Sequence, residues 1–472
     1  MPHPPVILWF RRDLRVSDHP ALLAAVAKGG PVIPVFIRDA AVEGLGAAPK
    51  WRLGEGLRAL AERLEDRGSR LILRSGDALA ELRALIAETG ATAVYWSRLY
   101  DPQAQTRDTA VKTALKAEGI EARSFGGHLM FEPWDVQTGT GSYYKVFSPM
   151  WRAVQGREVP YPQAAPAALP APDRWPQSET RTDWALGAAM RRGAEVVALH
   201  SWSGEAAAQT QLDHFLATGV DAYPVRRDLL DQDGTSSLAE YLALGEMSPH
   251  QAWHAALRVG TQGADAFRRQ LVWREFAYHL MFHTPHILTD NWKEGWAHFP
   301  WSQDAEHPHF RAWCQGRTGV RFVDAAMREM YVTGRMHNRG RMVVASYLTK
   351  HLLGHWRLGL KWFEDCLVDW DPANNAMGWQ WVAGCGPDAA PYFRIFNPDT
   401  QLKKFDATGG YTRKWIAEGT ARPSDTALSY FEAIPRSWRL LPTQHYPDPV
   451  VSLPDGRAAA LAAYEARENH GP

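Results

Sequence analysis

The feature that most constrains the fold is an alternation over residues 1–132, where apolar segments of strand length are separated by helical periodicity. We predict strands over 6–10, 31–37, 70–73, 93–97 and 120–125. We predict helices between them over 20–28, 51–67, 78–89 and 102–118. Strands that alternate with helices of this length form βαβ units around a buried parallel sheet. Residues 1–132 are therefore expected to be an α/β domain with a Rossmann-like sheet.

The first turn of that domain argues against a common kind of nucleotide site. Dinucleotide-binding domains carry a glycine-rich fingerprint there, because glycine lets the backbone approach the pyrophosphate closely. In this chain the turn reads Phe10-Arg-Arg-Asp-Leu-Arg-Val-Ser17 and holds no glycine. We therefore do not expect an NAD site of the Rossmann type.

The remaining residues divide into a connector and a helical domain. Prolines crowd residues 133–200, and this stretch shows no clear periodicity. Because proline fixes φ and removes a backbone donor, we predict an extended connector here. Residues 201–472 show helical patterns without strand alternation. We predict helices there over 205–218, 237–244, 249–259, 264–281, 320–332, 339–353, 362–367 and 457–468.

Composition excludes several classes of protein. The three cysteines have no CxxC spacing, so they form no disulfide framework and cannot supply the four thiolates of an iron–sulfur cluster. The longest apolar runs are far shorter than the ~20 residues of a membrane span. The N-terminal segment lacks the charged and apolar regions of a signal peptide. We therefore expect a soluble, cytoplasmic protein with no membrane partner.

Charge is balanced over the whole chain, with 52 basic and 52 acidic residues, but not along it. Between Arg311 and Lys361 ten basic residues accompany two acidic ones, which gives this segment a net charge of +8. One interpretation is a solvated helix face that acidic neighbours balance. The other is a groove in which these charges meet a nucleic-acid backbone while aromatic side chains stack on bases.

Two short segments carry groups that could hold a ligand. Gly234-Thr-Ser-Ser-Leu238 directly precedes a predicted helix, where backbone N–H groups and hydroxyls can bind phosphate, although a plain helix cap uses the same residues. Asp369-Trp-Asp-Pro-Ala-Asn-Asn375 gathers two carboxylates and two amides, which suit a metal or arginine partners. The histidine pairs 279/283 and 351/355 lack the glutamate of a zinc-binding helix, so we expect ordinary helix-face residues.

Six sequence motifs are spread in order over nearly the whole chain. They are Trp9-Phe-Arg-Arg-Asp-Leu-Arg15, Thr235-Ser-Ser-Leu238, Trp273-Arg-Glu-Phe276, Met336-His-Asn-Arg-Gly-Arg-Met342, Gly378-Trp-Gln-Trp381 and Pro391-Tyr-Phe-Arg-Ile-Phe-Asn-Pro398. Together they resemble the motifs of DNA photolyases and cryptochromes, a family of flavoproteins. The resemblance implies an N-terminal α/β antenna domain and an all-helical C-terminal domain, residues 201–472, that binds FAD in a U-shaped conformation.

The resemblance implies a set of flavin-binding residues. The phosphates would lie against Tyr223, Thr235, Ser236, Ser237, Leu238 and Arg274. The rest of the FAD would lie against Phe267, Gln270, Asn338, Arg341, Asp369, Asp371 and Asn374. A salt bridge between Arg341 and Asp369 would account for the acidic segment without a metal. The neutral amide of Asn374 would face flavin N5, which suits a reduced, anionic flavin and favours repair over photoreception.

The resemblance also gives a role to the tryptophans, which number 21 of 472 residues. Trp379, Trp356 and Trp301 match an electron-transfer chain that runs from the flavin to the surface. Trp273 and Trp381 match two aromatic walls that hold a flipped pyrimidine dimer. The other residues that would contact the DNA are Arg227, Gln270, Asn338, Arg339, Met342 and Arg394.

The implied function is light-dependent repair of UV-damaged DNA by an enzyme of the cyclobutane class. Excited, reduced FAD would donate an electron to the flipped dimer, which would split into two pyrimidines and return the electron. Two alternatives remain open: a cryptochrome-type blue-light photoreceptor and a (6-4) photoproduct photolyase. Gln270 favours (6-4) repair, since cyclobutane enzymes usually carry glutamate there, whereas Asn338 and Met342 replace histidines of (6-4) enzymes.

A second, light-harvesting chromophore is the last implication. The segment Tyr100-Asp-Pro-Gln-Ala-Gln-Thr-Arg107 has Ala104 where folate-binding members carry glutamate. Three alternatives follow: the folate is absent, it binds differently, or a flavin or deazaflavin replaces it. We expect the protein to act as a monomer.

Overall fold

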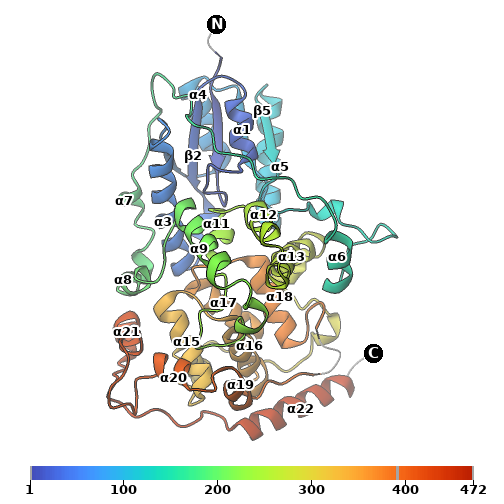
Figure 1. Cartoon of the computed structure of the whole chain (residues 1–472), viewed down its shortest axis with the longest axis vertical. Helices are drawn as coiled ribbons and strands as arrows, with labels where there is room; N and C mark the ends of the chain where they lie inside the picture. Colours follow the sequence, from blue (N-terminus) through green and yellow to red (C-terminus); the bar gives the residue numbers. More distant parts are fainter. Residues whose placement is uncertain (1–2, 390–392, 470–472) are drawn as a thin grey trace.

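The computed structural model describes residues 3–389 and 393–469, and its N-terminal part is a five-stranded parallel sheet (Figure 1). The strand order is β3-β2-β1-β4-β5. The strands are β1 (Val6–Phe10), β2 (Val32–Arg38), β3 (Ile72–Ser75), β4 (Ala93–Ser97) and β5 (Glu121–Phe125). All five lie within two residues of their predicted bounds, so the predicted α/β architecture is confirmed.

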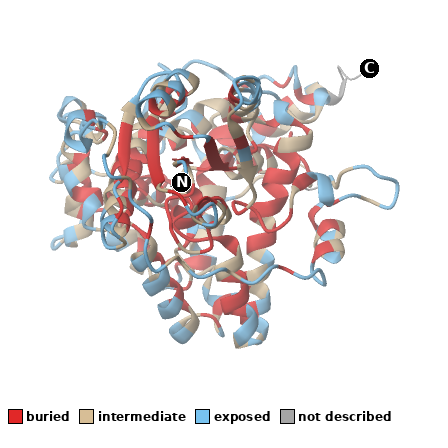
Figure 2. Cartoon of the chain, turned by 90° about the horizontal axis from the view of Figure 1, so that it is seen from above, coloured by how far each residue is buried: buried red, intermediate tan, exposed pale blue. Residues whose placement is uncertain are grey.

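The sheet is buried on both faces, which explains why its strands are apolar throughout. Because successive side chains of a strand face opposite ways, Leu8 and Phe10 of β1 join one hydrophobic cluster, while Ile7 and Trp9 join another. Figure 2 shows the buried strands enclosed by helices with exposed outer surfaces. These helices are α1 (Pro20–Val26), α2 (Ala40–Glu43), α3 (Ala47–Glu65), α4 (Ala78–Thr89) and α5 (Pro102–Ala117).

Ion pairs lie at the carboxyl ends of β1 and β4. The strand order runs in opposite directions from these two strands, and such a switch point is where open α/β sheets bind ligands. Arg11, in the turn without glycine, pairs there with Asp108 at 2.9 Å and donates to the carbonyl of Ser97. Its neighbour Arg107 pairs with Asp39 at 2.7 Å. These ion pairs thus lie beside the turn that carries the glycine-rich fingerprint in dinucleotide-binding domains.

The connector, residues 133–200, runs over the surface and is held to the sheet domain by backbone hydrogen bonds. The amide of Glu179 donates to the carbonyl of Leu73 at 2.9 Å. The connector also contains a helix that was not predicted, α6 (Phe147–Val154), whose buried residues are Phe147, Met150 and Val154. Its shorter helices are η1 (Pro133–Asp135), α7 (Arg181–Trp184), η2 (Ala188–Met190) and α8 (Gly193–Ala198).

The remainder is helical, and the described residues between 201 and 469 hold no strand, only an isolated bridge between Ser302 and Gly354. Within residues 3–389 and 393–469, no helix combines the length and apolar character needed to cross a membrane. The helices are α9 (Glu205–Thr218), α10 (Tyr223–Arg226), α11 (Ala239–Leu244), α12 (Pro249–Val259), α13 (Gln262–His283), η3 (Pro285–Leu288), η4 (Glu294–Trp296), α14 (Pro308–Cys314), α15 (Arg321–Thr333), α16 (Asn338–Ser346), η5 (Tyr347–His351), α17 (Trp356–Cys366), α18 (Pro372–Ala383), α19 (Pro398–Phe405), α20 (Gly410–Trp415), α21 (Asp425–Ala433), η6 (Arg436–Trp438) and α22 (Leu453–Asn469).

One predicted helix, over 339–353, is interrupted. The α-helix ends at Ser346, and a π-helical turn (Tyr347–His351) follows it. The carbonyl of Thr349 in this turn accepts the indole N–H of Trp301 at 2.8 Å. A tertiary contact, which periodicity does not report, therefore accompanies the change of helix type.

The two domains are joined at the end of helix α11. The last carbonyl groups of a helix have no partner within it, and here the first turn of the sheet domain supplies donors. The three contacts are Arg12 Nε to the carbonyl of Ala243 at 3.0 Å, the amide of Leu14 to Leu244 at 3.1 Å, and Arg15 Nη1 to Gly245 at 3.0 Å. The sheet domain thus holds, by its far end, the helix that follows the predicted phosphate loop.

Candidate flavin and DNA site

The loop before α11 has the backbone geometry of an anion cradle. Ser237 has a left-handed φ of 51°, and Leu238 after it is right-handed, an arrangement that points successive N–H groups toward one side. Gln211 of α9 fixes the loop by donating to the carbonyl of Ser236 at 3.0 Å. The hydroxyls of Thr235 and Ser237 lie 3.4 Å apart. Because α11 has only six residues, the loop itself would hold a phosphate, with little help from the helix dipole.

Two of the predicted flavin-binding aromatics lie together beside this loop. Gly234 packs so closely that a Cβ would lie 2.3 Å from the carbonyl oxygen of Arg226, which brings α10 against the loop. Tyr223 of α10 packs edge-on against Phe267 of α13, with ring centres 6.0 Å apart. The guanidinium of Arg227 lies 5.3 Å from the centre of the Tyr223 ring. A positive charge and two buried rings therefore flank the cradle.

The structure contains the predicted ion pair between Arg341 and Asp369, with 2.7 Å between nitrogen and oxygen. Arg341 is also fixed by a bond from Nε to the carbonyl of Met336 at 2.9 Å. The other carboxylate oxygen, Oδ1 of Asp369, is buried without a partner in the part of the chain that the structure describes. Since buried acceptors ordinarily have a donor, this oxygen fits a bound group such as FAD. Among the same described residues, no cluster of three or more His, Cys, Asp or Glu could hold a metal.

Helix α18 presents an open face that carries two predicted site residues. Asp371 is its N-cap, whose carboxylate accepts the amide of Asn374 at 2.9 Å, and Pro372 is its first residue. Asn374, Gly378 and Trp381 follow at helical spacing and so share one face. Apart from the helix's own backbone, a Cβ at Gly378 would meet no atom of the described residues within 4 Å. The face between Asn374 and Trp381 is therefore free to receive a ligand.

Two residues that the resemblance assigns to the flavin, Asp371 and Arg274, have protein partners in the structure. The carboxylate of Asp371 also accepts the hydroxyl of Tyr278 at 2.7 Å and lies 3.5 Å from Arg12. Burial alone would raise the pKa of Asp371, but Arg12 and Arg274 hold this pKa below its usual value. Arg274 donates to the carbonyl of His128 at 3.0 Å. Both side chains thus lie at the interface between the domains, which favours an indirect role in positioning α18.

The three tryptophans of the predicted electron-transfer chain are buried, with 2%, 0% and 7% of Trp379, Trp356 and Trp301 exposed. The His355 ring lies between the last two, with its centre 5.6 Å from Trp356 and 5.3 Å from Trp301. Trp301 was predicted to end the chain at the surface. Instead it stacks on Trp296, a buried residue, at 5.4 Å. Trp301 is only 7% exposed, so a chain through these residues would end at a largely buried ring.

Close packing of α17 on α18 depends on Gly359. A Cβ there would lie 2.0 Å from the ring of Trp379. The variant Gly359→Ala must therefore move a helix or the ring, and such overpacking costs about 1–3 kcal/mol. We expect a lower unfolding temperature by calorimetry, and slower light-driven flavin reduction because Trp356 lies on the displaced helix. An unchanged unfolding temperature would contradict the contact.

The two predicted walls of the dimer pocket are each held by a residue that the sequence did not single out. Trp273 of α13 stacks on Phe147 of α6, with ring centres 3.7 Å apart and planes 8° apart. Trp381 donates from its indole to the carbonyl of Asp388 at 2.8 Å, and the guanidinium of Arg394 lies 6.0 Å from its ring. The apolar spacing within α6 was the only signal for Phe147, and Asp388 had none.

Most charges of the basic segment 311–361 are paired with acidic residues from elsewhere in the chain. Arg328 is fully buried and donates to Glu418 at 2.6 and 2.9 Å. Arg339 pairs with Asp228 at 2.6 Å, and Arg227 lies 3.8 Å from the same residue. Further pairs are Arg311–Glu306, Arg335–Glu240, Arg341–Asp369, Arg357–Asp290 and Lys361–Glu364. Acidic neighbours therefore balance most of the segment, as the first interpretation predicts. Arg227 and Arg339 share the single carboxylate of Asp228, so a net positive charge remains there.

Helix α18 brings the predicted residues together, because it packs against α13, α16 and α17. Helix α13 supplies Trp273 and, one turn earlier, the half-buried Gln270. Helix α16 supplies Arg339, Arg341 and the pair Asn338 and Met342, whose amide nitrogen and sulfur lie 3.9 Å apart. The candidate site is therefore a cluster of helix faces centred on α18.

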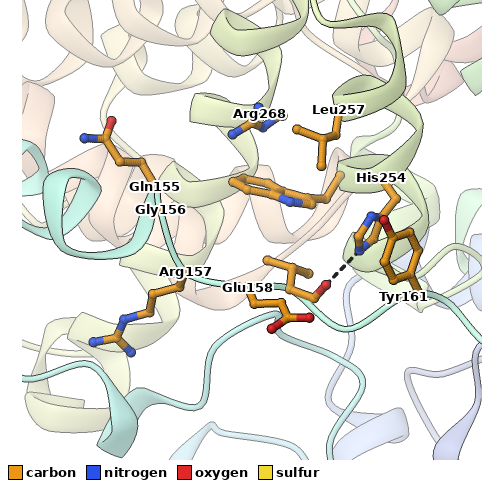
Figure 3. Close-up of a pocket in the computed structure, with 10 residues that line it drawn as sticks. Gln155, Gly156, Arg157, Glu158, Tyr161, His254, Leu257 and Arg268 are labelled. Atoms are coloured by element: carbon orange, nitrogen blue, oxygen red, sulfur yellow. Dashed lines mark hydrogen bonds between the residues drawn. The ribbon is translucent and has the colours of Figure 1, made fainter.

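A separate pocket of about 220 Å³ lies between the connector and helices α12 and α13 (Figure 3). The guanidinium of Arg268 lies 4.3 Å from the Trp253 ring in its wall, and Tyr161 stacks on His254 at 4.2 Å. Its lining includes none of the predicted flavin or DNA residues. We therefore keep it apart from the candidate site.

Comparison with known protein families matches both ends of the chain. A family described as DNA photolyase matches residues 6–172, and one described as FAD binding domain of DNA photolyase matches residues 267–466. The deoxyribodipyrimidine photo-lyase of Agrobacterium fabrum is 45% identical over 470 residues, which cover 98% of this chain and 98% of that protein.

Two solved structures share the arrangement of both domains. A bacterial class III photolyase from Agrobacterium tumefaciens has a TM-score of 0.92 and 43% identity, covering 99% of this chain and 98% of that one. An archaeal photolyase from Sulfolobus tokodaii, solved with two FAD molecules, has a TM-score of 0.80 and 25% identity, covering 98% and 100%.

Proposed function

This chain belongs to the DNA photolyase family, and from that premise we propose that it repairs UV-damaged DNA as a deoxyribodipyrimidine photo-lyase. Its cofactor is FAD, which the cradle before α11 and the unpaired oxygen of Asp369 fit. Its substrate is a cyclobutane pyrimidine dimer turned out of the duplex. A crosslinked dimer is poorly stacked and paired, so its extrusion costs less than that of normal bases.

The shared open face of α18 is the observation that carries this proposal. Asn374 and Trp381 are seven residues apart, which corresponds to about 10 Å along a helix. A flavin at Asn374 and a dimer at Trp381 would therefore be close neighbours. When bound, reduced and illuminated, FAD supplies the electron that splits the dimer and receives it back.

The chain's own residues bind and orient both partners. Asn374 offers a neutral amide, which can hydrogen-bond a ring nitrogen without giving up a proton. Trp273 and Trp381 would hold the dimer by stacking, a contact that every base can make. Arg227 and Arg339 would contact DNA phosphates, which position a duplex without reading its sequence.

Illumination of the reduced protein with DNA that carries one defined lesion tests the function. We expect restored pyrimidines from a cyclobutane dimer and none from a (6-4) photoproduct. Repair of only the (6-4) photoproduct would show that Gln270 marks the lesion class and that our substrate is wrong. Photoreduction of the flavin without repair of either lesion would favour the photoreceptor instead.

Gly378→Ala separates fold stability from ligand binding. Alanine stabilises a helix interior by about 1 kcal/mol relative to glycine, and the new Cβ meets no atom within 4 Å among the described residues outside its own helix backbone. We therefore expect the flavin-free protein to unfold at a higher temperature. The same methyl group intrudes between Asn374 and Trp381, so binding of FAD or of dimer-containing DNA should weaken about tenfold. If both ligands bind as before, the open face is not the site.

We also propose a second, light-harvesting chromophore, a cytoplasmic location and a monomeric state. The photolyase from Sulfolobus tokodaii, solved with two FAD molecules, supports the second chromophore, whose identity chromatography of the extracted pigments would establish. The free cysteines Cys314, Cys366 and Cys385 agree with a reducing compartment. Light scattering after gel filtration measures the oligomeric state, and a mass of two chains would exclude the monomer.

A further inference from the structure

The two aromatic walls lie on different helices, so a dimer pocket between them needs a fixed spacing. Trp273 lies in the second half of α13, and Trp381 lies near the end of α18. Both side chains are half-buried, so the surrounding core does not enclose either of them. The contacts made by each ring therefore decide its orientation.

Phe147 covers one face of the first wall. The Phe147 and Trp273 rings stack with centres 3.7 Å apart, and Phe147 is only 1% exposed. Phe276 packs edge-on against both rings, at 5.8 Å from Trp273 and 5.9 Å from Phe147. One face of Trp273 is thus held by α6, which leaves the opposite face for a ligand.

Asp388 connects the second wall to the same helix. Its backbone carbonyl accepts the indole N–H of Trp381 at 2.8 Å, and its carboxylate accepts the backbone N–H of Phe147 at 3.4 Å. Phe147 is the first residue of α6, and Val146 before it has no side chain that could cap the helix. The carboxylate of Asp388 therefore supplies the missing cap, where negative charge is favourable.

The backbone of Asp388 indicates that its side chain matters. Its φ of 51° lies in the left-handed region, which glycine adopts without cost and other residues adopt at a loss of stability. Glycine would adopt this conformation at a lower cost, but it has no carboxylate to cap α6.

We propose that Asp388 and Phe147 are positioning residues that set the spacing of Trp273 and Trp381 around the dimer. This inference rests on the proposed function. Its consequence is a change in selectivity, because undamaged DNA that stays in the duplex meets the arginines but not the two walls. Loss of either residue should therefore weaken binding of damaged DNA alone.

Asp388→Gly tests the connection while keeping the backbone conformation. The flavin-loaded protein, kept oxidised in the dark, binds dimer-containing DNA without repairing it. We expect the ratio of its affinities for damaged and undamaged DNA to fall about fivefold, the effect of one lost hydrogen bond. In Asp388→Asn the ratio should stay within about twofold of that of the unaltered protein, because asparagine tolerates the left-handed region and keeps an acceptor oxygen. An unchanged ratio in Asp388→Gly overturns the proposal.

Phe147→Leu, compared with Phe276→Leu, separates positioning from general packing. Both variants remove a buried ring that contacts Trp273, so both should lower the unfolding temperature. Only Phe147 covers the face of Trp273, and we expect only Phe147→Leu to lower the affinity ratio, again about fivefold. Equal ratios in the two variants would mean that Phe147 acts only through stability, which also overturns the proposal.

The double variant Phe147→Leu/Asp388→Gly tests whether the two residues position the tryptophans through the same contact. Because they act through one contact, we expect its ratio to fall no further than about twofold below the lower of the two single variants. Two losses that multiply in full would show independent effects and contradict the inference. Measurements on the unaltered protein distinguish failure of this inference from failure of the proposed function. If the unaltered protein does not bind damaged DNA more tightly than undamaged DNA, the proposed function itself is wrong.

Discussion

Replacing Arg52 with methionine is expected to lower the free energy of unfolding by about 3–5 kcal/mol. Arg52 of α3 is fully buried, and its guanidinium donates to Glu246 at 2.5 and 2.9 Å and to Glu240 at 3.3 Å. Both carboxylates are themselves 1% exposed. Methionine fills a similar volume but leaves them buried without this counter-charge. Glu240 belongs to α11, which follows the phosphate loop, so the variant should also lose FAD more readily.

The loss of unfolding free energy in Arg52→Met should be smaller at low pH than at high pH. Burial already raises the pKa of Glu246, against the opposing effect of Arg52, so removal of Arg52 raises this pKa further. Between the unfolded value of about 4.3 and the raised folded value, the folded chain binds more protons than the unfolded one. Stability then falls as pH rises. Urea denaturation should therefore show a smaller difference between Arg52→Met and the unaltered protein at pH 5 than at pH 8.

Arg58→Met, on the same helix, is the matched control. Arg58 pairs with Glu55 at 3.2 Å and Glu62 at 2.8 Å, but these groups lie in contact with solvent, where such pairs contribute about 0.5 kcal/mol or less. If Arg52→Met destabilises the protein no more than Arg58→Met, the buried ion pairs of Arg52 with Glu240 and Glu246 do not hold the two domains together.

The N-terminal domain could be predicted from the sequence because its strands carry a local signal. Strands buried on both faces are continuous apolar runs, and helical periodicity separates them. The starts of helices also depend on local sequence: Asp77 and Asp101 stand directly before the predicted helices 78–89 and 102–118, and each accepts the backbone amide three residues later. Both features depend only on neighbours in the chain.

Ion pairs and packing contacts between residues far apart in the chain could not be predicted in this way. The basic segment looked unbalanced because the partner of Arg328 is Glu418, 90 residues away, and that of Arg339 is Asp228, 111 residues away. Helix α6 was missed because it is only eight residues long within a proline-rich stretch, and much of its stability comes from packing on α13. Tertiary contacts of this kind leave no periodic trace.

The candidate site shows the same division. Motifs that resemble the family predicted the ion pair between Arg341 and Asp369, which the structure contains. The same motifs did not reveal that Asp371 and Arg274 are engaged at the domain interface, with Tyr278 and His128 among their partners. A motif identifies which residues recur together, while the partner of each side chain depends on the packing of the whole chain.

The second large effect separates two tryptophans on α18. Trp381→Ala should reduce affinity for dimer-containing DNA by about 10- to 100-fold, since stacking contributes about 1–3 kcal/mol per base. It should leave light-driven flavin reduction unchanged. Trp379→Phe should have the opposite outcome: photoreduction slows more than tenfold because phenylalanine is much harder to oxidise, while enzyme reduced beforehand repairs normally. DNA-binding titrations and absorbance during illumination measure the two effects.

Trp415→Phe is a fair control for the second variant, because Trp415 and Trp379 are both 2% exposed and neither indole N–H has a partner among the described residues. The substitution therefore removes a buried indole without breaking a hydrogen bond at either position, and only Trp379→Phe should slow photoreduction. Residues 379 and 381 point to nearly opposite sides of α18, about 200° apart. Photoreduction at the normal rate in Trp379→Phe would remove Trp379 from the chain and leave the pocket at Trp381 intact, since the two roles depend on different sides of one helix.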